Sequence, residues 1–134
     1  MILIVTGQYA GGEYFYPLIS LWKKKKFKNY ALVAESFSRL FWKRKKVDFI
    51  DGPQNTEDAV KSFLKSMNLS LVLLSASANV ELEFLVIKQA KTLGIRTAVF
   101  LDTWTNYQMR FLYRDAPLYP DIIGSIDKKC SQEM

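Results

Sequence analysis

Apolar runs of strand length alternate with helix-like periods along the whole chain, and this alternation limits the possible folds more than any other feature of the sequence. The strand-like runs cover 1–6, 30–35, 47–50, 69–75, 96–101 and 121–126. Most of them are separated by the dozen or so residues that a helical crossover between parallel strands needs. The pattern predicts an α/β fold, a three-layer α/β/α sandwich whose mostly parallel sheet has about six strands.

Two of the expected helices carry residues that suit their ends. Thr56 is placed to cap a helix whose first turn is acidic and whose last turn is basic, which matches the helix dipole. Asn79 is expected to cap a second helix over 80–93, and Gly94 to end it in the left-handed conformation. The 80–93 helix has an apolar stripe, so we expect it to cover the sheet.

Length and composition indicate one globular domain over 1–134. The chain has 134 residues, 49% of them hydrophobic, and no apolar run reaches the roughly 20 residues of a membrane span. Its start, MILIVTG, lacks the basic region of a signal peptide, so we expect a cytoplasmic protein. The sequence has no histidine and a single cysteine, Cys130, which excludes the usual zinc spacings and an internal disulfide. We expect no metal and no cofactor.

Two clusters of basic residues lie beside large aromatic side chains and account for much of the net charge of +6. Such clusters suit an anionic membrane surface, where each cation contributes about 1 kcal/mol and the rings lie at headgroup level. They are also typical of the solvated C-terminal ends of surface helices. Nucleic acid would be attracted as well, but we do not expect it as the partner. The residues of this candidate membrane or anion patch are Trp22, Lys23, Lys24, Lys25, Lys26, Trp42, Lys43, Arg44, Lys45 and Lys46.

A glycine-rich segment follows the first strand. Gly7, Gln8, Gly11 and Gly12 precede a helix that we expect to open near Glu13. Glycines allow a sharp turn and a close approach to a ligand, and a helix N-terminus offers free N–H groups. The spacing is neither the dinucleotide fingerprint nor a P-loop, since Glu13 stands where the phosphate-binding lysine would be. The segment is either a plain turn or a loop that lines a polar site.

Polar side chains follow most of the predicted strands, at the edge where open α/β sheets bind ligands. Without histidine, a general base has to be a carboxylate, and Asp102 is the preferred candidate. The alternative for Asp102 is a role in capping local backbone N–H groups. A serine hydrolase is not expected, because Ser75 and Ser77 lack a nucleophile-elbow motif. The strand-end residues are Gln8, Tyr9, Glu35, Ser36, Asp51, Ser75, Ser77, Asp102 and Asp127.

An aromatic and polar segment comes directly after Asp102. Trp104, Asn106 and Tyr107 would suit the wall of a ligand site, because their rings can stack on a sugar or a base. The rings could equally fill a gap between the sheet edge and the 103–119 loop. A loop of that length without regular structure is usually functional or disordered.

Two stretches resemble a known fold group. MILIVTGQYAGGEYFYPLISLWKK resembles the opening of the N-terminal half of GT-B glycosyltransferases and of the sugar-nucleotide 2-epimerases that share their fold. The stretch from SASANVELEF to DIIGSID resembles a little-characterised bacterial GT-B-like family of polysaccharide synthesis. In that family a strand ending in Leu-Asp is followed by His-Trp-x-Asn-Tyr and Arg-Phe, and Thr103 replaces the histidine here. The matching residues are Leu101, Asp102, Trp104, Asn106, Tyr107, Arg110, Phe111, Pro120, Asp121 and Asp127.

The resemblance implies a Rossmann-like half that binds the acceptor side of a sugar-transfer site. The sugar nucleotide would lie mainly on a second half, in the same or another chain, and this half alone would be inactive. The basic and aromatic patch would then face the inner side of a membrane and its lipid-linked acceptor. Two other readings remain open. One is a nucleoside deoxyribosyltransferase-like hydrolase with Glu81 or Glu83 as nucleophile, and the other is a flavodoxin-like module that binds a ligand without catalysis.

Overall fold

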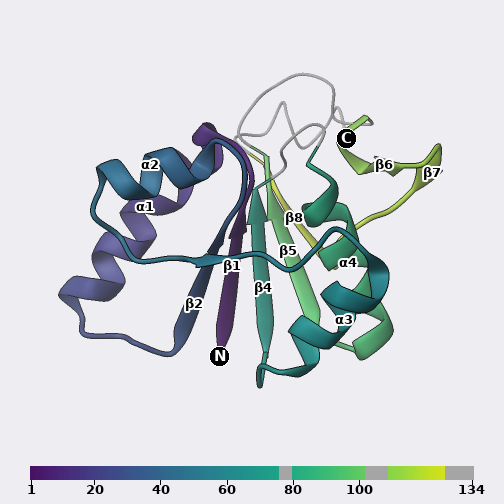
Figure 1. The fold of residues 1–134 in the computed structure, drawn as a ribbon, viewed down its shortest axis with the longest axis horizontal. Helices are drawn as coiled ribbons and strands as arrows, with labels where there is room; N and C mark the ends of the chain where they lie inside the picture. The colour runs from purple at the N-terminus through teal and green to yellow at the C-terminus, as the bar shows by residue number, and fades with distance from the viewer. Residues whose placement is uncertain (76–79, 102–108, 126–134) are drawn as a thin grey trace.

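A computed structural model of the protein describes residues 1–75, 80–101 and 109–125. Within these ranges the main sheet has six parallel strands in the order β3-β2-β1-β4-β5-β8 (Figure 1). This confirms the predicted α/β class and parallel sheet. The strands are β1 (Ile2–Thr6), β2 (Tyr30–Ala34), β3 (Ile50–Asp51), β4 (Leu71–Ser75), β5 (Arg96–Phe100) and β8 (Ile122–Gly124).

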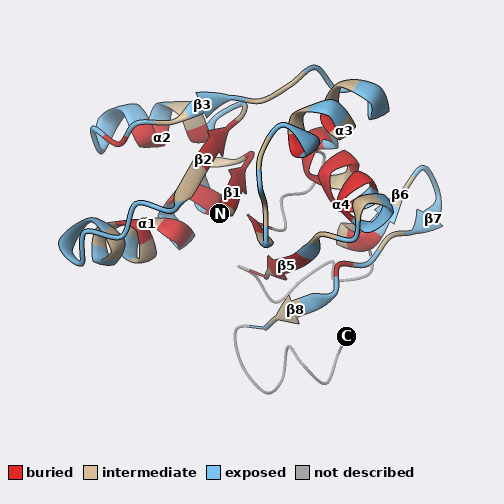
Figure 2. Ribbon diagram, turned by 90° about the horizontal axis from the view of Figure 1, so that it is seen from below, coloured by how far each residue is buried: buried red, intermediate tan, exposed pale blue. Residues whose placement is uncertain are grey.

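Helices cover both faces of the sheet and complete the three layers. The pair α1 and α2 lies on one face, and the pair α3 and α4 lies on the other (Figure 2). The side chains of β1 alternate accordingly, since Leu3 and Val5 join the α3 and α4 layer while Ile4 joins the α1 and α2 layer. The helices are α1 (Tyr9–Lys24), α2 (Ser38–Arg44), α3 (Glu57–Lys65) and α4 (Glu81–Leu93).

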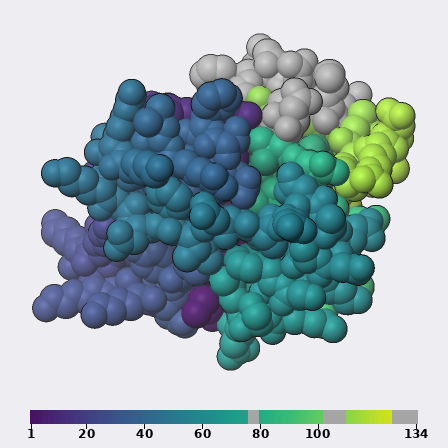
Figure 3. All heavy atoms as spheres, viewed as in Figure 1, coloured from purple at the N-terminus to yellow at the C-terminus, as the bar shows by residue number. Residues whose placement is uncertain are grey.

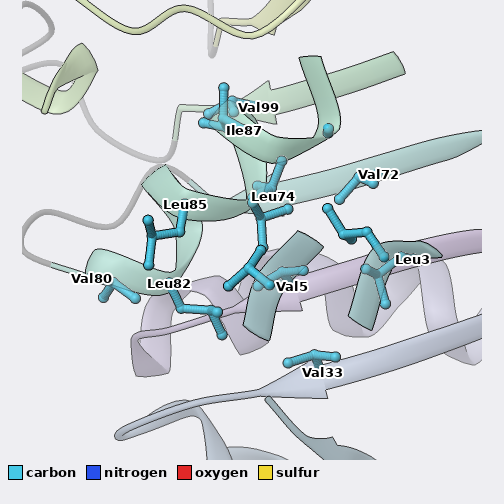
Figure 4. Packing of buried hydrophobic residues seen from close by; sticks show 14 of the residues in the cluster. Leu3, Val5, Val33, Val72, Leu74, Val80, Leu82, Leu85, Ile87 and Val99 are labelled. Carbon is cyan, nitrogen blue, oxygen red and sulfur yellow. The ribbon is translucent and has the colours of Figure 1, made fainter. Parts of the chain in front are cut away.

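The larger part of the core lies between the sheet and α4. In Figure 4, Leu82 and Leu85 of α4 gather with apolar side chains of the central strands, such as Val5 and Leu74. All four of these side chains are at most 1% exposed. Burial on this scale stabilises a fold by about 1.5–3 kcal/mol for each large apolar side chain. The central strands therefore contribute a large share of the hydrophobic stabilisation of the fold.

The helix-end predictions are confirmed where the structure describes them. The Thr56 hydroxyl oxygen accepts a hydrogen bond from the Ala59 backbone N–H at 3.2 Å. Gly94 ends α4 with φ of 70°, in the left-handed region. The predicted cap residue Asn79 lies outside the described residues, and Val80 is the residue before α4.

Two expectations about secondary structure need correction. The third strand is not 47–50 but the short β3, because Val47 closes the end of α2 through its N–H bond to the Trp42 carbonyl. The 103–119 segment is not wholly irregular. It contains a 3-10 turn, η1 (Met109–Phe111), and a small antiparallel hairpin of β6 (Leu112–Tyr113) and β7 (Ala116–Pro117).

The hairpin of β6 and β7 turns through two residues in the left-handed region. Arg114 has φ of 51° and Asp115 has φ of 61°, the pairing required by the tight hairpin turn that matches strand twist. Glycine and asparagine, the usual residues of such a turn, are absent there. This explains why the hairpin was not predicted from the sequence.

Asp121 fixes the start of β8 against the start of β5. Its Oδ2 accepts hydrogen bonds from the Thr97 backbone N–H at 2.8 Å and from the Thr97 hydroxyl at 3.2 Å. In return, the Asp121 backbone N–H lies 3.1 Å from the Thr97 Oγ1. The backbone hydrogen bond is the main cause that lowers the pKa of the Asp121 carboxyl. Asp121, one of the residues that carry the resemblance, therefore has a structural role at the amino edge of the sheet.

Candidate functional site

The carboxyl ends of the parallel strands meet at one edge of the sheet, and two predicted site residues lie at its centre. Gln8 is the N-cap residue of α1, directly after β1, and Ser75 ends the neighbouring strand β4. The strand order reverses between β1 and β4, since the chain leaves β1 for β2 on one side and places β4 on the other. Open α/β sheets bind their ligands at such a switch point.

The glycine-rich segment is organised differently from the expectation. The predicted helix start near Glu13 is wrong, because α1 begins at Tyr9 and includes Gly11 and Gly12 in its first turn. A Cβ on Gly11 would collide with the Ser75 side chain, and one on Gly12 would collide with a buried phenylalanine ring of α2. The absent side chains thus let α1 pack closely on β4 and α2. Ligand binding by these glycines stays a prediction.

Gly7 makes a similar close contact outside the helix. It is buried between β1 and α1, and a Cβ there would lie 2.6 Å from the Val80 side chain. Real Cβ atoms essentially never approach so closely. Gly7 therefore brings the end of β1 directly against the residue that precedes α4.

A buried serine and a buried glutamate form a hydrogen-bonded pair at this edge. The Ser75 hydroxyl donates a hydrogen bond of 2.8 Å to the Glu83 Oε1. Ser75 is 2% exposed and Glu83 4% exposed. The sequence singled out Ser75 as a strand-end residue and Glu83 only as a nucleophile in one alternative. Their pairing was missed, although a glutamate among the buried leucines of α4 was a usable signal.

A cavity of about 10 Å³ lies beside this pair, between α4 and η1. Arg110 and Phe111 line it from η1, Glu83 lines it from α4, and Ser75 lines it from the sheet. Its volume matches about one water molecule and is far too small for a sugar or a nucleobase. In the described part of the chain, Glu83 is therefore shielded from a ligand of that size.

Glu81 is the other candidate nucleophile of the hydrolase alternative, and its side chain is exposed. Its Oε1 lies 3.3 Å from the Tyr113 hydroxyl and 3.5 Å from an Nη atom of Arg114. Partial desolvation, followed by the hydrogen bond and charge of Glu81, raises the pKa of the Tyr113 hydroxyl, while Arg114 opposes the shift. Glu81 thus ties the first turn of α4 to the β6 and β7 hairpin.

A second polar group lies at the carboxyl ends of β2 and β3. Arg39 places one Nη atom 3.5 Å from the Glu35 carboxylate and 3.4 Å from the Asp51 carboxylate. Its Nε donates a hydrogen bond to the Ala34 carbonyl at 3.2 Å. The nearby Ser38 hydroxyl donates to the Thr6 carbonyl at 2.7 Å. The strand-end residues Glu35 and Asp51 are therefore brought together, through an arginine that the sequence analysis did not select.

Six other predicted site residues follow the strands β4, β5 and β8 in the sequence. Leu101, the residue directly after β5, is 1% exposed. The predicted site residues outside the described residues are Ser77, Asp102, Trp104, Asn106, Tyr107 and Asp127. Within the described ranges, no group of three or more histidine, cysteine, aspartate or glutamate side chains is arranged to hold a metal ion.

The two basic clusters are the C-terminal ends of α1 and α2. In both helices the last turn is basic, and the lysines and the arginine are exposed. The structure therefore confirms that both clusters lie at exposed helix ends. Their contact with a membrane stays a prediction. In the space-filling view, side chains from this purple-to-blue part of the chain project at the left (Figure 3). None of the helices in the described ranges has the length and apolarity to cross a membrane.

The expectation that both tryptophans face a surface is wrong for Trp42. Its ring is 0% exposed, and its Nε1–H donates a hydrogen bond of 2.9 Å to the Thr6 hydroxyl oxygen. Trp22 is only partly buried and packs on the rings of Phe27 and Tyr30, with centroids 5.0 and 4.9 Å away. The difference arises because α2 presents Trp42 to the end of β1, while Trp22 lies at the far end of α1. Only the first cluster therefore has an accessible tryptophan.

Comparisons with known proteins bear on the fold. No protein family matches this sequence, and no curated protein matches it. Among solved structures, the chain is similar to the crystal structure of a "putative UDP-N-acetylglucosamine 2-epimerase" from Listeria monocytogenes, with a TM-score of 0.66 and 13% identity. The alignment covers 98% of this chain and 40% of the other, so the chain spans less than half of that protein's length. Similarity at this identity shows a shared fold, which supports the predicted Rossmann-like, GT-B-like architecture without showing a particular family.

Proposed function

We propose that this chain is the acceptor-side half of a GT-B-like glycosyltransferase for envelope polysaccharide synthesis, inactive without a second half. The main supporting observation is that 98% of the chain aligns with 40% of a protein whose name refers to a UDP-sugar. The second half, in the same or another polypeptide, would supply most of the sugar-nucleotide site. The protein would work on the cytoplasmic side of a membrane and use a lipid-linked acceptor.

In this proposal Asp102 is the general base that removes a proton from the acceptor hydroxyl. The chain has no histidine, so a carboxylate has to fill that role. Trp104, Asn106, Tyr107 and Asp127 would bind the acceptor, with Ser77 beside them. Gln8 at the N-terminus of α1 supports the proposal, because it stands at the switch point where ligands of such sheets bind.

The hydrolase alternative receives less support from the geometry. A carboxylate nucleophile has to reach the anomeric carbon of its substrate. Glu83 is 4% exposed and faces a cavity of about 10 Å³, and Glu81 contacts Tyr113 and Arg114. We therefore favour the transferase half.

The test is complementation of sugar transfer. Membranes from the source organism that lack this chain are supplied with a radiolabelled UDP-sugar, and transfer to lipid-linked material is measured with and without the purified protein. We expect the protein to restore transfer, to show no turnover alone, and to lose the effect in Asp102→Asn. The matched control is Asp115→Asn, an exposed carboxylate in the hairpin turn. Robust transfer or hydrolysis by the pure chain would contradict the proposal, as would normal transfer in membranes without it.

A further inference from the structure

A large groove opens at the amino ends of the strands, away from the carboxyl edge described above. It has a volume of about 810 Å³ and lies between the end of α1, the start of β2 and the segment before β3. The volume falls in the range of about 300–1,000 Å³ that is usual for sites of small molecules. Its apolar lining consists of Phe27, Tyr30, Ala31, Leu32, Phe49 and Ile50.

The groove exists because β3 is too short to cover the outer side of β2. Among the described strands, β3 pairs with β2 only at Val33 and Ala34. The first half of β2 has no neighbouring described strand on that side, and the segment before β3 lines the groove opposite it. An apolar hollow therefore remains where a longer third strand would have closed the sheet.

The rim of the groove is positively charged. Lys23, Lys26 and Lys28 line it, and Asp48 is the single carboxylate among its lining residues. The turn that ends α1 holds two of these lysines in place. The Lys26 N–H bonds to the Lys23 carbonyl at 3.1 Å, and the Phe27 N–H bonds to the Trp22 carbonyl at 2.9 Å. The groove thus combines an apolar floor with an excess of cations at its mouth.

The part of the groove around Tyr30 has low polarity. Partial burial is the main cause that raises the pKa of the Tyr30 hydroxyl, and the Asp48 carboxylate adds to it. The ring of Tyr30 stacks on that of Phe27, with centroids 6.3 Å apart. An aromatic floor of this kind favours a flexible hydrocarbon chain over a hydrated polar ligand.

We propose that this groove binds an acyl chain of an anionic phospholipid, whose phosphate is held by Lys23, Lys26 and Lys28. The proposal rests on the membrane contact of the proposed function and adds to it a defined lipid site. The site lies at the amino edge of the sheet, so a bound lipid would hold the domain at the membrane without filling the acceptor site at the carboxyl edge.

The direct test uses lipid that is dissolved as monomers. Binding of dihexanoyl phosphatidylglycerol is measured by calorimetry and by the fluorescence of Trp22 in a background that carries both Trp42→Phe and Trp104→Phe. Dihexanoyl phosphatidylcholine tests the need for negative charge, and glycerol phosphate tests the need for acyl chains. We expect the anionic lipid to bind at least about tenfold more tightly than either comparison ligand, because only it engages both parts of the groove. Equal affinity for glycerol phosphate would show a plain anion site and overturn the proposal.

The other end of the basic patch supplies a matched control. The triple variant Lys23→Gln, Lys26→Gln, Lys28→Gln removes three charges from the rim, and Lys43→Gln, Arg44→Gln, Lys46→Gln removes three from the end of α2, outside the groove. All six side chains are exposed, so we expect both variants to fold. The first should lose about tenfold or more in affinity for the monomeric lipid, and the second less than about threefold. Equal losses would overturn the proposal.

A variant that fills the groove tests the acyl chain by itself. Ala31→Phe enlarges a lining residue that also packs against the α3 and α4 core, so the retained fold is checked by circular dichroism. We expect lipid binding to weaken at unchanged charge, and unchanged binding in a folded variant would contradict the site. Co-sedimentation with phosphatidylglycerol vesicles separates the two proposals. Vesicle binding that both triple variants weaken equally, without monomer binding, would retain the proposed membrane contact and reject the groove. Complementation of sugar transfer does not depend on either result.

Discussion

The two basic helix ends share a sequence pattern and a backbone but differ in their surroundings. Each has a tryptophan, four basic residues and an apolar residue, in the segments 22–27 and 42–47. Each ends in the same turn, with a lysine in the left-handed region, Lys26 at φ of 59° and Lys46 at φ of 55°. In the second segment the tryptophan is 0% exposed, whereas in the first it is partly exposed beside the groove.

The difference shows what local sequence decides and what it leaves open. The final turn of each helix is set by residues within six positions, through hydrogen bonds such as that from the Val47 N–H to the Trp42 carbonyl at 3.0 Å. The role of the tryptophan is set by distant residues, since its partner Thr6 is 36 positions from Trp42. The same local sequence pattern can therefore bury its tryptophan in the core at one place and leave it partly exposed at another.

The largest expected effect is on stability when each tryptophan is removed. Trp42→Ala should lower the free energy of unfolding by about 3–5 kcal/mol, because it leaves a cavity in the core. Trp22→Ala should cost about 1–2 kcal/mol, since its ring is only partly buried. Urea unfolding followed by circular dichroism measures both. Similar losses in the two variants would contradict the described difference in burial.

Thr6→Val isolates the hydrogen bond that distinguishes Trp42. It removes the acceptor of a buried indole N–H and should cost about 1–3 kcal/mol. In a Trp42→Phe background the cost should fall well below that, because no indole N–H is left unpaired. The two measurements form a double-mutant cycle, and the same cost in both backgrounds would show that the bond does not contribute.

Glycine at the left-handed lysines tests the feature that the two ends share. Lys26→Gly and Lys46→Gly should each raise the free energy of unfolding by about 0.5–1 kcal/mol, because a side chain is costly in that conformation. The neighbours Lys25 and Lys45 have φ of −82° and −83°, so glycine there should be destabilising instead. A stabilising effect at only one of the two ends would mean that their turns differ.

The smallest expected effect concerns Tyr30, which has no tyrosine counterpart at the second end. Partial burial and Asp48 raise its pKa above the ordinary 10.0, so Asp48→Asn should move the pKa partway down. The folded protein keeps this proton at a pH where the unfolded chain has lost it. The contribution of Tyr30 to stability is thus constant below about pH 10 and falls as the pH rises through the folded-state pKa. Ultraviolet titration, with Tyr30→Phe to assign the signal, measures the shift.

Much of the fold was predictable because the central strands are buried on both faces. β1, β4 and β5 read as continuous apolar runs, which is how fully covered parallel strands appear in a sequence. The start of α1 was predicted too late, because Gly11 and Gly12 are poor helix formers. Their close packing on Ser75 and Phe41 outweighs that preference, and such a contact between distant residues is not visible in a local pattern.

The candidate site was only partly predictable. The rule that strands end at a common edge correctly gathered Gln8, Ser75, Glu35 and Asp51 around the carboxyl end of the sheet. It could not identify the buried partner of Ser75, because Glu83 reaches it from the next helix. The groove beside β2 could not be foreseen either, since it depends on how few residues β3 contributes to the sheet.

The central position of β1 has a consequence for the order in which the chain is synthesised. Most of the core between the sheet and α1 and α2 comes from the first 47 residues, among them Ile4, Phe15 and Trp42. The opposite face of β1 is covered later, since Leu3 and Val5 pack in a cluster to which α3 and α4 contribute. On the ribosome, one side of the first strand is therefore sheltered early while its other side stays open until α4 has emerged. A nascent chain of which only about the first 70 residues have left the ribosome would be a half-covered sheet, and this is the stage at which we expect chaperones to bind it most strongly.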